Sequence, residues 1–223
     1  GRRKKGRVDR RGARRPFAKT AAMTRPLCGI FVGGAAKRMG GYPKGLLPAG
    51  PSAEPIVLRL ATLVQSLGLR VVLVGQHAAY EDLGLPQLAD RPPGVGPLGG
   101  LCALLHAAEG GDVLALACDM PFVTLHIVKR LCDADLADAD AITAQTADDA
   151  PLESFLARYR PSVLPVIEQK LALGERSLQR ILQGLRVKKL RLAPDELAVS
   201  RDWDRIDELP EALREKVQKA GVT

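Results

Sequence analysis

Residues 33–44 combine closely spaced glycines with basic residues. Gly33, Gly34 and Gly40 surround Arg38, and Lys44 closes the segment. Glycine lets a backbone approach a ligand closely, and exposed main-chain N–H groups already favour an anion. Arg38 and Lys44 would add positive charge at the same place. This pattern is typical of a loop that holds the phosphates of a nucleotide, and it makes Arg38 and Lys44 candidate catalytic residues.

Asp119 is the strongest candidate for a catalytic carboxylate. It follows the apolar run 113–118, and Pro121 comes two residues later. A carboxylate at the end of a buried strand is costly unless it is solvated, paired or bound to a metal. Mg²⁺ takes one or two carboxylates together with water and phosphate oxygens. We therefore expect Asp119 to hold Mg²⁺, and the alternative is an N-cap for the next helix.

Two further acids, Asp202 and Asp204, flank Trp203 near the end of the chain. They could complete a metal site or contact a second substrate. The alternative is that both are solvated acids ahead of a helix, where negative charge is favoured.

Two common phosphate-binding motifs are excluded. A P-loop requires Lys followed by Ser or Thr, whereas Lys44 is followed by Gly45. Residues 94–99 match the dinucleotide pattern G-x-G-x-x-G, but Pro92 and Pro93 precede them. Prolines do not sit in a central strand, so no strand leads into that glycine segment.

Short apolar runs alternate with amphipathic segments over most of the chain. We expect strands at 27–32, 70–74, 87–90, 113–118, 139–143, 152–159 and 186–192, and helices at 55–67, 98–108, 125–131, 163–173, 177–182 and 206–220. Such alternation predicts an α/β fold with a mostly parallel sheet and helices on both faces. Ligands of these folds bind beyond the carboxyl ends of the strands. The loop 33–44, Asp90 and Asp119 all follow such ends.

The net charge of +8 is unevenly distributed. Residues 1–25 hold eleven of the 33 basic residues and one of the 25 acidic ones, so residues 26–223 hold 22 and 24. A basic arm could bind nucleic acid or an anionic membrane, but its few large apolar groups predict disorder. Because Met23 resembles a natural start, residues 1–25 are expected to be a disordered arm or an upstream extension, and residues 26–223 a single domain.

The sequence predicts neither a membrane span nor a secretory signal. A span needs about 20 mostly apolar residues, and the longest uncharged stretch, 92–108, is interrupted by glycines and prolines. The four cysteines, at 28, 102, 118 and 132, form no CxxC pair and show no metal-ligand spacing. Buried thiols in a reducing cytoplasm are expected. The three histidines, at 77, 106 and 126, form no ligand pattern either.

Five segments, in this order, resemble the molybdenum cofactor guanylyltransferases, a family of nucleotide-sugar pyrophosphorylase type. These are the glycine segment 33–44, Gly-Pro-Leu-Gly-Gly at 96–100, Cys-Asp-Met-Pro at 118–121, Gly-Glu-Arg at 174–176, and Asp-Trp-Asp-Arg-Ile-Asp-Glu-Leu at 202–209. The resemblance covers Leu27 to about Leu213. The family has Asn where this chain has Asp202 and Asp204.

The resemblance implies a three-layer α/β/α, Rossmann-like nucleotidyltransferase. Its expected reaction is Mg²⁺-dependent transfer of GMP from GTP to molybdopterin, with release of pyrophosphate, in the cytoplasm. The implied nucleotide-binding residues are Phe31, Val32, Gly33, Gly34, Arg38, Met39, Gly40, Lys44, Asp90, Gly96, Pro97, Leu98 and Asp119. Transient contact with a molybdoenzyme or a cofactor-assembly protein is also expected, whereas nucleic acid and membrane partners are not.

Two alternatives remain open at this point. An enzyme of the same fold could use CTP or a sugar-phosphate acceptor. A non-enzymatic protein could instead bind nucleotides, or nucleic acid through its basic arm.

Overall fold

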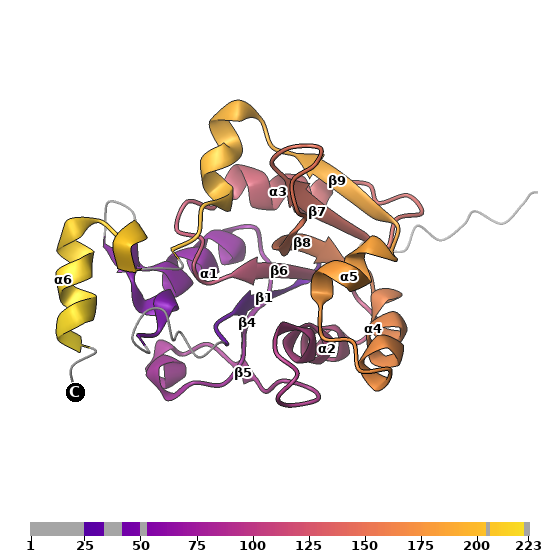
Figure 1. Ribbon diagram of the computed structural model, residues 1–223, viewed down its shortest axis with the longest axis horizontal. Helices are drawn as coiled ribbons and strands as arrows, with labels where there is room; N and C mark the ends of the chain where they lie inside the picture. The colour runs from indigo at the N-terminus through magenta and orange to yellow at the C-terminus, as the bar shows by residue number, and fades with distance from the viewer. Residues whose placement is uncertain (1–24, 34–41, 50–52, 204–205, 221–223) are drawn as a thin grey trace, which may run out of the picture.

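A seven-stranded β-sheet forms the centre of the protein (Figure 1). The computed structural model describes residues 25–33, 42–49, 53–203 and 206–220. The strands are β1 (Leu27–Phe31), β4 (Val71–Val74), β5 (Gln87–Leu88), β6 (Val113–Ala117), β7 (Ala141–Gln145), β8 (Glu153–Tyr159) and β9 (Val187–Arg191). They are ordered β5-β4-β1-β6-β8-β7-β9 across the sheet. Only β8 runs antiparallel to its neighbours among these strands, which confirms the mostly parallel prediction.

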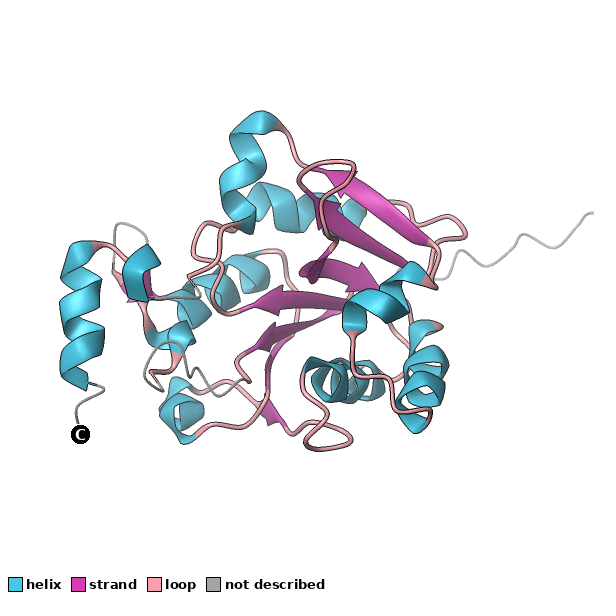
Figure 2. Ribbon diagram, in the orientation of Figure 1, coloured by secondary structure: helices cyan, strands magenta, loops and turns pink. Residues whose placement is uncertain are grey.

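Helices cover both faces of the sheet (Figure 2). One face packs against α1 (Ile56–Ser66) and α3 (Leu125–Asp133), and the other against α2 (Pro97–Ala107), α4 (Val163–Ala172) and α5 (Leu178–Gln183). The last helix, α6 (Glu211–Ala220), lies beyond α1 at the edge of the molecule (Figure 1). This arrangement confirms the predicted three-layer α/β/α fold.

Residue alternation along β1 explains why two helical layers can share one sheet. Cys28 and Ile30 are buried on the α1 side, whereas Leu27 is buried on the α2 side. Gly29 lies under α2, where an added Cβ would be 2.5 Å from Leu104 Cδ2. Because real Cβ atoms do not approach so closely, a glycine here lets α2 lie directly on the strand that leads into the glycine segment.

The predicted ends of most elements agree with the structure to within two residues. Thr124 is the N-cap of α3, since its Oγ1 accepts a hydrogen bond from the N–H of Ile127 at 3.4 Å. The single helix expected over 206–220 is wrong. A 3₁₀ turn at Ile206–Glu208 is followed by Pro210, and α6 begins after it. Proline cannot donate within a helix, so it separates the two pieces.

The sequence patterns missed several short elements. These are the 3₁₀ helices η2 (Lys44–Leu46), η3 (Ala78–Leu83) and η4 (Pro194–Ser200), and the small hairpin of β2 (Pro48–Ala49) and β3 (Glu54–Pro55). Segments of two to seven residues are too short to show a periodic pattern. Two of them, η2 and η3, contribute directly to the cavity described below.

The cysteines carry free thiols. Cys28, Cys102 and Cys118 are buried as expected, whereas Cys132 is only partly buried. Among the helices of the described residues, none combines the length and apolar composition that a membrane-spanning helix needs.

Candidate active site

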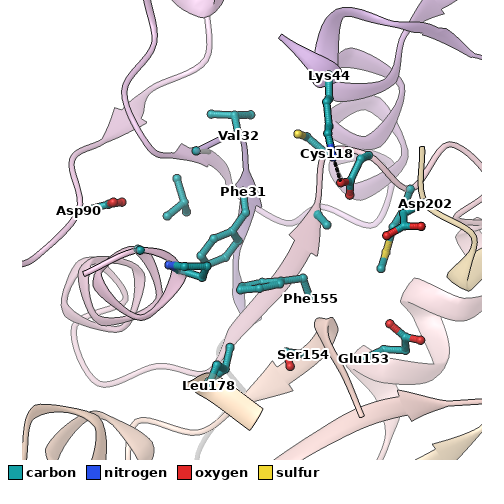
Figure 3. Close-up of a pocket in the computed structure, with 18 of the residues that line it drawn as sticks. Phe31, Val32, Lys44, Asp90, Cys118, Glu153, Ser154, Phe155, Leu178 and Asp202 are labelled. Atoms are coloured by element: carbon teal, nitrogen blue, oxygen red, sulfur yellow. Dashed lines mark hydrogen bonds and ion pairs between the residues drawn. The ribbon is translucent and has the colours of Figure 1, made fainter. Parts of the chain in front are cut away.

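A cavity of about 880 Å³ opens at the carboxyl ends of β1, β4 and β6 (Figure 3). Its lining comes from these strand ends, the segment 43–44, η3, the start of α2, the first residues of β8, the start of α5, and Asp202. Because β8 runs against its neighbours, its amino end reaches the same edge of the sheet as their carboxyl ends. The cavity therefore joins the two halves of the chain.

Lys44 and Asp119 form an ion pair at one wall of the cavity. The Lys44 ammonium lies 3.1 Å from Asp119 Oδ2, and the two side chains are 14% and 20% exposed (Figure 3). Lys44 begins η2, and Asp119 follows the end of β6. The sequence predicts both residues at the site but gives no sign that they contact each other. Each charge is thus partly neutralised by the other.

Tyr80 supports the backbone next to Lys44. Its side chain is 1% exposed, and its hydroxyl oxygen accepts a hydrogen bond from the N–H of Gly45 at 3.2 Å. A Cβ at Gly45 would lie 3.0 Å from Tyr80 Oη and 3.3 Å from Cys118 Cβ. Burial raises the pKa of the Tyr80 hydroxyl and raises that of the Cys118 thiol to about 12, so both stay protonated at neutral pH.

The floor of the cavity is formed by the end of β1. The N–H groups of Val32 and Gly33 both donate to the carbonyl of Val74, at 2.9 and 3.3 Å. The Phe31 ring packs against Phe155 of β8 with centroids 4.5 Å apart. These contacts fix the backbone at the entrance to the glycine segment. Phe31, Val32 and Gly33, all expected to bind nucleotide, line the cavity.

Asp90 lies on the side of the cavity away from Asp202 and Glu153 (Figure 3). A Cβ at Gly100 would be 2.7 Å from Val74 Cγ1 and 3.4 Å from Asp90 Oδ1, so this glycine lets the helix start approach the carboxylate. Burial raises the pKa of Asp90.

Of the three residues at the start of α2 that were expected to contact the nucleotide, two line the cavity and one does not. Gly96 and Pro97 line the cavity. Leu98, by contrast, is fully buried in the core between α2 and the sheet and does not line the cavity.

The far wall contains polar residues that the sequence analysis did not single out. Gln179 donates from Nε2 to the carbonyl of Leu152 at 2.7 Å and to Ser154 Oγ at 2.9 Å, which ties α5 to the start of β8. Glu153 also lines the cavity, and burial, followed by the charge of Asp202, raises its pKa. Glu153 lay within a predicted strand, and nothing in its local pattern marked it.

The segment that carries Asp202 is attached to the end of β6. The N–H of Trp203 donates to the carbonyl of Asp119 at 2.9 Å, and the Trp203 ring packs edge-on against Phe122. Asp202 lines the same cavity as Asp119, and its role at a metal or a second substrate stays a prediction. Five predicted site residues lie outside the described part of the chain, and these are Gly34, Arg38, Met39, Gly40 and Asp204.

Asp119 presents a partly exposed carboxylate to the cavity and is the candidate ligand for a divalent cation. Asp202 and Glu153 line the same cavity, but among the described residues they do not gather with Asp119 into one three-carboxylate cluster. Mg²⁺ is bound through such oxygens together with water and phosphate groups. Because the Lys44 ammonium shares the Asp119 carboxylate, a bound cation and Lys44 would have to divide it between them.

Comparison with known proteins identifies the family. The model of the MobA-like NTP transferase domain matches residues 28–197, which include the cavity walls from β1 to α5. The chain belongs to this family. It is therefore a nucleotidyltransferase, and the resemblance inferred from the five sequence segments is confirmed.

Several curated relatives have a more specific name. A molybdenum cofactor guanylyltransferase from Pseudomonas putida is 34% identical over 79% of this chain and 93% of its own length. A probable molybdenum cofactor guanylyltransferase from Carboxydothermus hydrogenoformans is 32% identical over 71% and 78%.

Solved structures confirm the fold. Molybdopterin-guanine dinucleotide biosynthesis protein A from Archaeoglobus fulgidus matches with a TM-score of 0.64 at 21% identity, covering 86% of this chain and 97% of that one. A 2-C-methyl-D-erythritol 4-phosphate cytidylyltransferase from Thermus thermophilus matches with a TM-score of 0.55 at 17% identity, covering 89% and 100%.

Proposed function

We propose that this enzyme transfers GMP from GTP to a molybdopterin-type acceptor in a Mg²⁺-dependent reaction that releases pyrophosphate. An oxygen of the acceptor's terminal phosphate attacks the α-phosphorus of GTP. The bond from that phosphorus to the α,β-bridging oxygen breaks, and pyrophosphate leaves with the electron pair. The two curated relatives described above carry the corresponding name.

The single observation that carries this proposal is the Lys44–Asp119 pair at the wall of a cavity that spans both halves of the chain. Transfer of a nucleotidyl group needs positioning and charge stabilisation more than a covalent nucleophile. A cation and a carboxylate 3.1 Å apart supply the two opposite charges that a metal–triphosphate complex requires. When the nucleotide enters, Lys44 would turn to its phosphate oxygens and release the carboxylate.

In this proposal Asp119 would hold Mg²⁺, with water and the phosphate oxygens of the nucleotide as the remaining ligands. When bound, the ion would neutralise charge that develops on the phosphate oxygens. Lys44 would then stabilise the leaving pyrophosphate. Arg38, which lies outside the described residues, is proposed for the same task because of its place in the glycine segment.

The base would lie between the end of β1 and Asp90. The backbone of Val32 and Gly33 lines the cavity there, and a carboxylate can accept hydrogen bonds from both N1–H and N2–H₂ of guanine. The acceptor would enter from the wall formed by the start of β8, the start of α5 and Asp202. We also propose a cytoplasmic reaction, which suits four free thiols, and transient contact with proteins that supply or receive the cofactor.

Pyrophosphate release from each of the four nucleoside triphosphates, with and without molybdopterin, tests this function. We expect release with GTP only when both Mg²⁺ and the acceptor are present, and loss of nearly all turnover in Asp119→Ala. The exposed Asp195, at the start of η4, provides the matched control, and Asp195→Ala should keep full activity. A preference for CTP, or normal turnover in Asp119→Ala, would contradict the proposal.

A further inference from the structure

Three side chains that belong to no part of the nucleotide cavity meet between α2 and α4. Cys102 and His106 are one helical turn apart on α2, and Glu168 faces them from α4. Their ligand atoms, one sulfur, one imidazole nitrogen and one carboxylate oxygen, all lie within 4.8 Å of one another. His106 Nε2 and Glu168 Oε1 are 2.9 Å apart. Sequence spacing gives no hint of this cluster because Glu168 is 62 residues from His106.

One side of the cluster is buried and the other is exposed to solvent. Cys102 is 2% exposed, whereas the side chains of His106 and Glu168 are 32% and 50% exposed. A second cavity, of about 380 Å³, is lined by Cys102, Glu168, Leu171 and Arg176 among others. An ion could therefore reach the sulfur from solvent without any rearrangement of the core.

Thiolate, imidazole and carboxylate together form the donor set of a borderline-soft cation. Zn²⁺ binds sulfur at about 2.3 Å, nitrogen at about 2.0–2.1 Å and oxygen at about 2.0–2.2 Å, in tetrahedral geometry. Two ligand atoms around such an ion are separated by somewhat more than 3 Å, so a small opening of the His106–Glu168 contact would admit it. Mg²⁺, in contrast, prefers six oxygen ligands. The cluster thus differs in chemistry from the carboxylates of the nucleotide cavity.

We propose that Cys102, His106 and Glu168 form a three-ligand site for a Zn²⁺-class divalent cation that links α2 to α4. The fourth position faces the second cavity and takes water. The bound ion fixes the distance between two helices that contact through apolar side chains and through the His106–Glu168 pair. Because α2 begins at the nucleotide cavity and Arg176 lines both cavities, the ion also stiffens one wall of that cavity.

Co²⁺ is the probe, since a thiolate ligand gives it a charge-transfer band in the near ultraviolet that oxygen ligands do not. The full chain is titrated without nucleotide or Mg²⁺. We expect a band that saturates at one equivalent and that Zn²⁺ abolishes. At Zn²⁺ a hundredfold above its dissociation constant, the Tm should rise by roughly 5–10 °C. Failure to form the band overturns the proposal.

Substitutions show whether the thiolate that gives the band is Cys102 or Cys118, which lies next to Asp119. Cys102→Ala should remove the band, and His106→Ala and Glu168→Gln should each weaken Co²⁺ binding at least ~10-fold. Cys118→Ala and Cys132→Ala should retain the band, and so should Asp119→Ala, so a failed nucleotide assay leaves this result unaffected. Cys102→Ser tests for a folding defect, because its Tm without metal shows whether the packing around residue 102 is kept. A band that follows Cys118 instead of Cys102 refutes the assignment.

Discussion

Substitution of Gly45 by alanine tests whether the backbone next to Lys44 needs its close contact with Tyr80. The new Cβ would lie 3.0 Å from Tyr80 Oη, 3.1 Å from Tyr80 Cε1 and 3.3 Å from Cys118 Cβ. Tyr80 is buried and cannot swing into solvent, so the backbone of η2 must move. Overpacking of this kind costs roughly 1–3 kcal/mol, and the Gly45–Tyr80 hydrogen bond, worth about 1 kcal/mol, weakens with it.

Gly184 is the matched control. It has φ −92° and ψ −3° at the end of α5, and an added Cβ would be 3.5 Å from its nearest neighbour, an ordinary contact. Alanine at such a position stabilises by about 0.4–1 kcal/mol, because the unfolded chain loses conformational freedom. In urea unfolding, the free energy of unfolding should therefore fall in Gly45→Ala and rise in Gly184→Ala.

Activity gives a second measurement. Gly45→Ala should displace Lys44 and reduce kcat/KM for GTP roughly 10- to 100-fold, since small errors in positioning are costly. Tyr80→Phe removes the nearest of the contact atoms but leaves Cε1, so the double variant should be less destabilised than the sum of the two single variants. Additive free energies, or a Gly45→Ala protein as stable as Gly184→Ala, would refute the steric argument.

Other substitutions probe separate parts of the structure. Lys44→Met should lower kcat/KM for GTP at least ~100-fold (about 2.7 kcal/mol of transition-state stabilisation). Lys44→Arg keeps the positive charge and should lower kcat/KM less; equal losses in the two variants would contradict a role for the cation. Burial raises the pKa of Asp90, so its ionised form destabilises the folded state at neutral pH. Asp90→Asn should thus unfold at higher urea than the wild type at pH 7.5, and the difference should shrink as the pH falls towards 4; a pH-independent difference would be inconsistent with burial as the cause. Arg158 is 3% exposed and donates to the carbonyls of Cys132 and Ala134 at the end of α3. Arg158→Ala should lower the free energy of unfolding by roughly 1–3 kcal/mol for each carbonyl that loses its donor. Arg158→Lys should lower it less, and a variant as stable as the wild type would contradict this role of Arg158.

The part of the cavity proposed to bind the nucleotide could be predicted from the sequence because its residues follow buried strands. The apolar runs 27–32 and 113–118 each end in polar or glycine residues, and parallel strands carry such ends to one edge. Lys44 and Asp119 could therefore be placed at the same edge from the pattern alone. Their direct contact could not, because η2 is too short to leave a periodic signal and Tyr80, which supports it, lies in a missed 3₁₀ helix.

The Cys102 cluster was missed for a different reason. Its two residues on α2 share a helix face, but the sequence predicts only a buried thiol at Cys102 and no ligand pattern for His106. The third residue comes from a helix whose packing partner is set by the tertiary fold. Spacing rules describe neighbours within one element, and they carry no information on which helices will touch.

The direction of β8 decides which residues complete the cavity. Its antiparallel register pairs Leu116 with Leu156 and Val113 with Tyr159. The same antiparallel direction brings the start of β8 to the edge where β6 ends, and so Glu153 and Asp119 both line the cavity. A parallel β8 would instead have carried Tyr159 to this edge and left Glu153 at the far end of the sheet. A single reversed strand thus supplies part of the second wall, and the residue types of a strand do not reveal the direction in which it pairs.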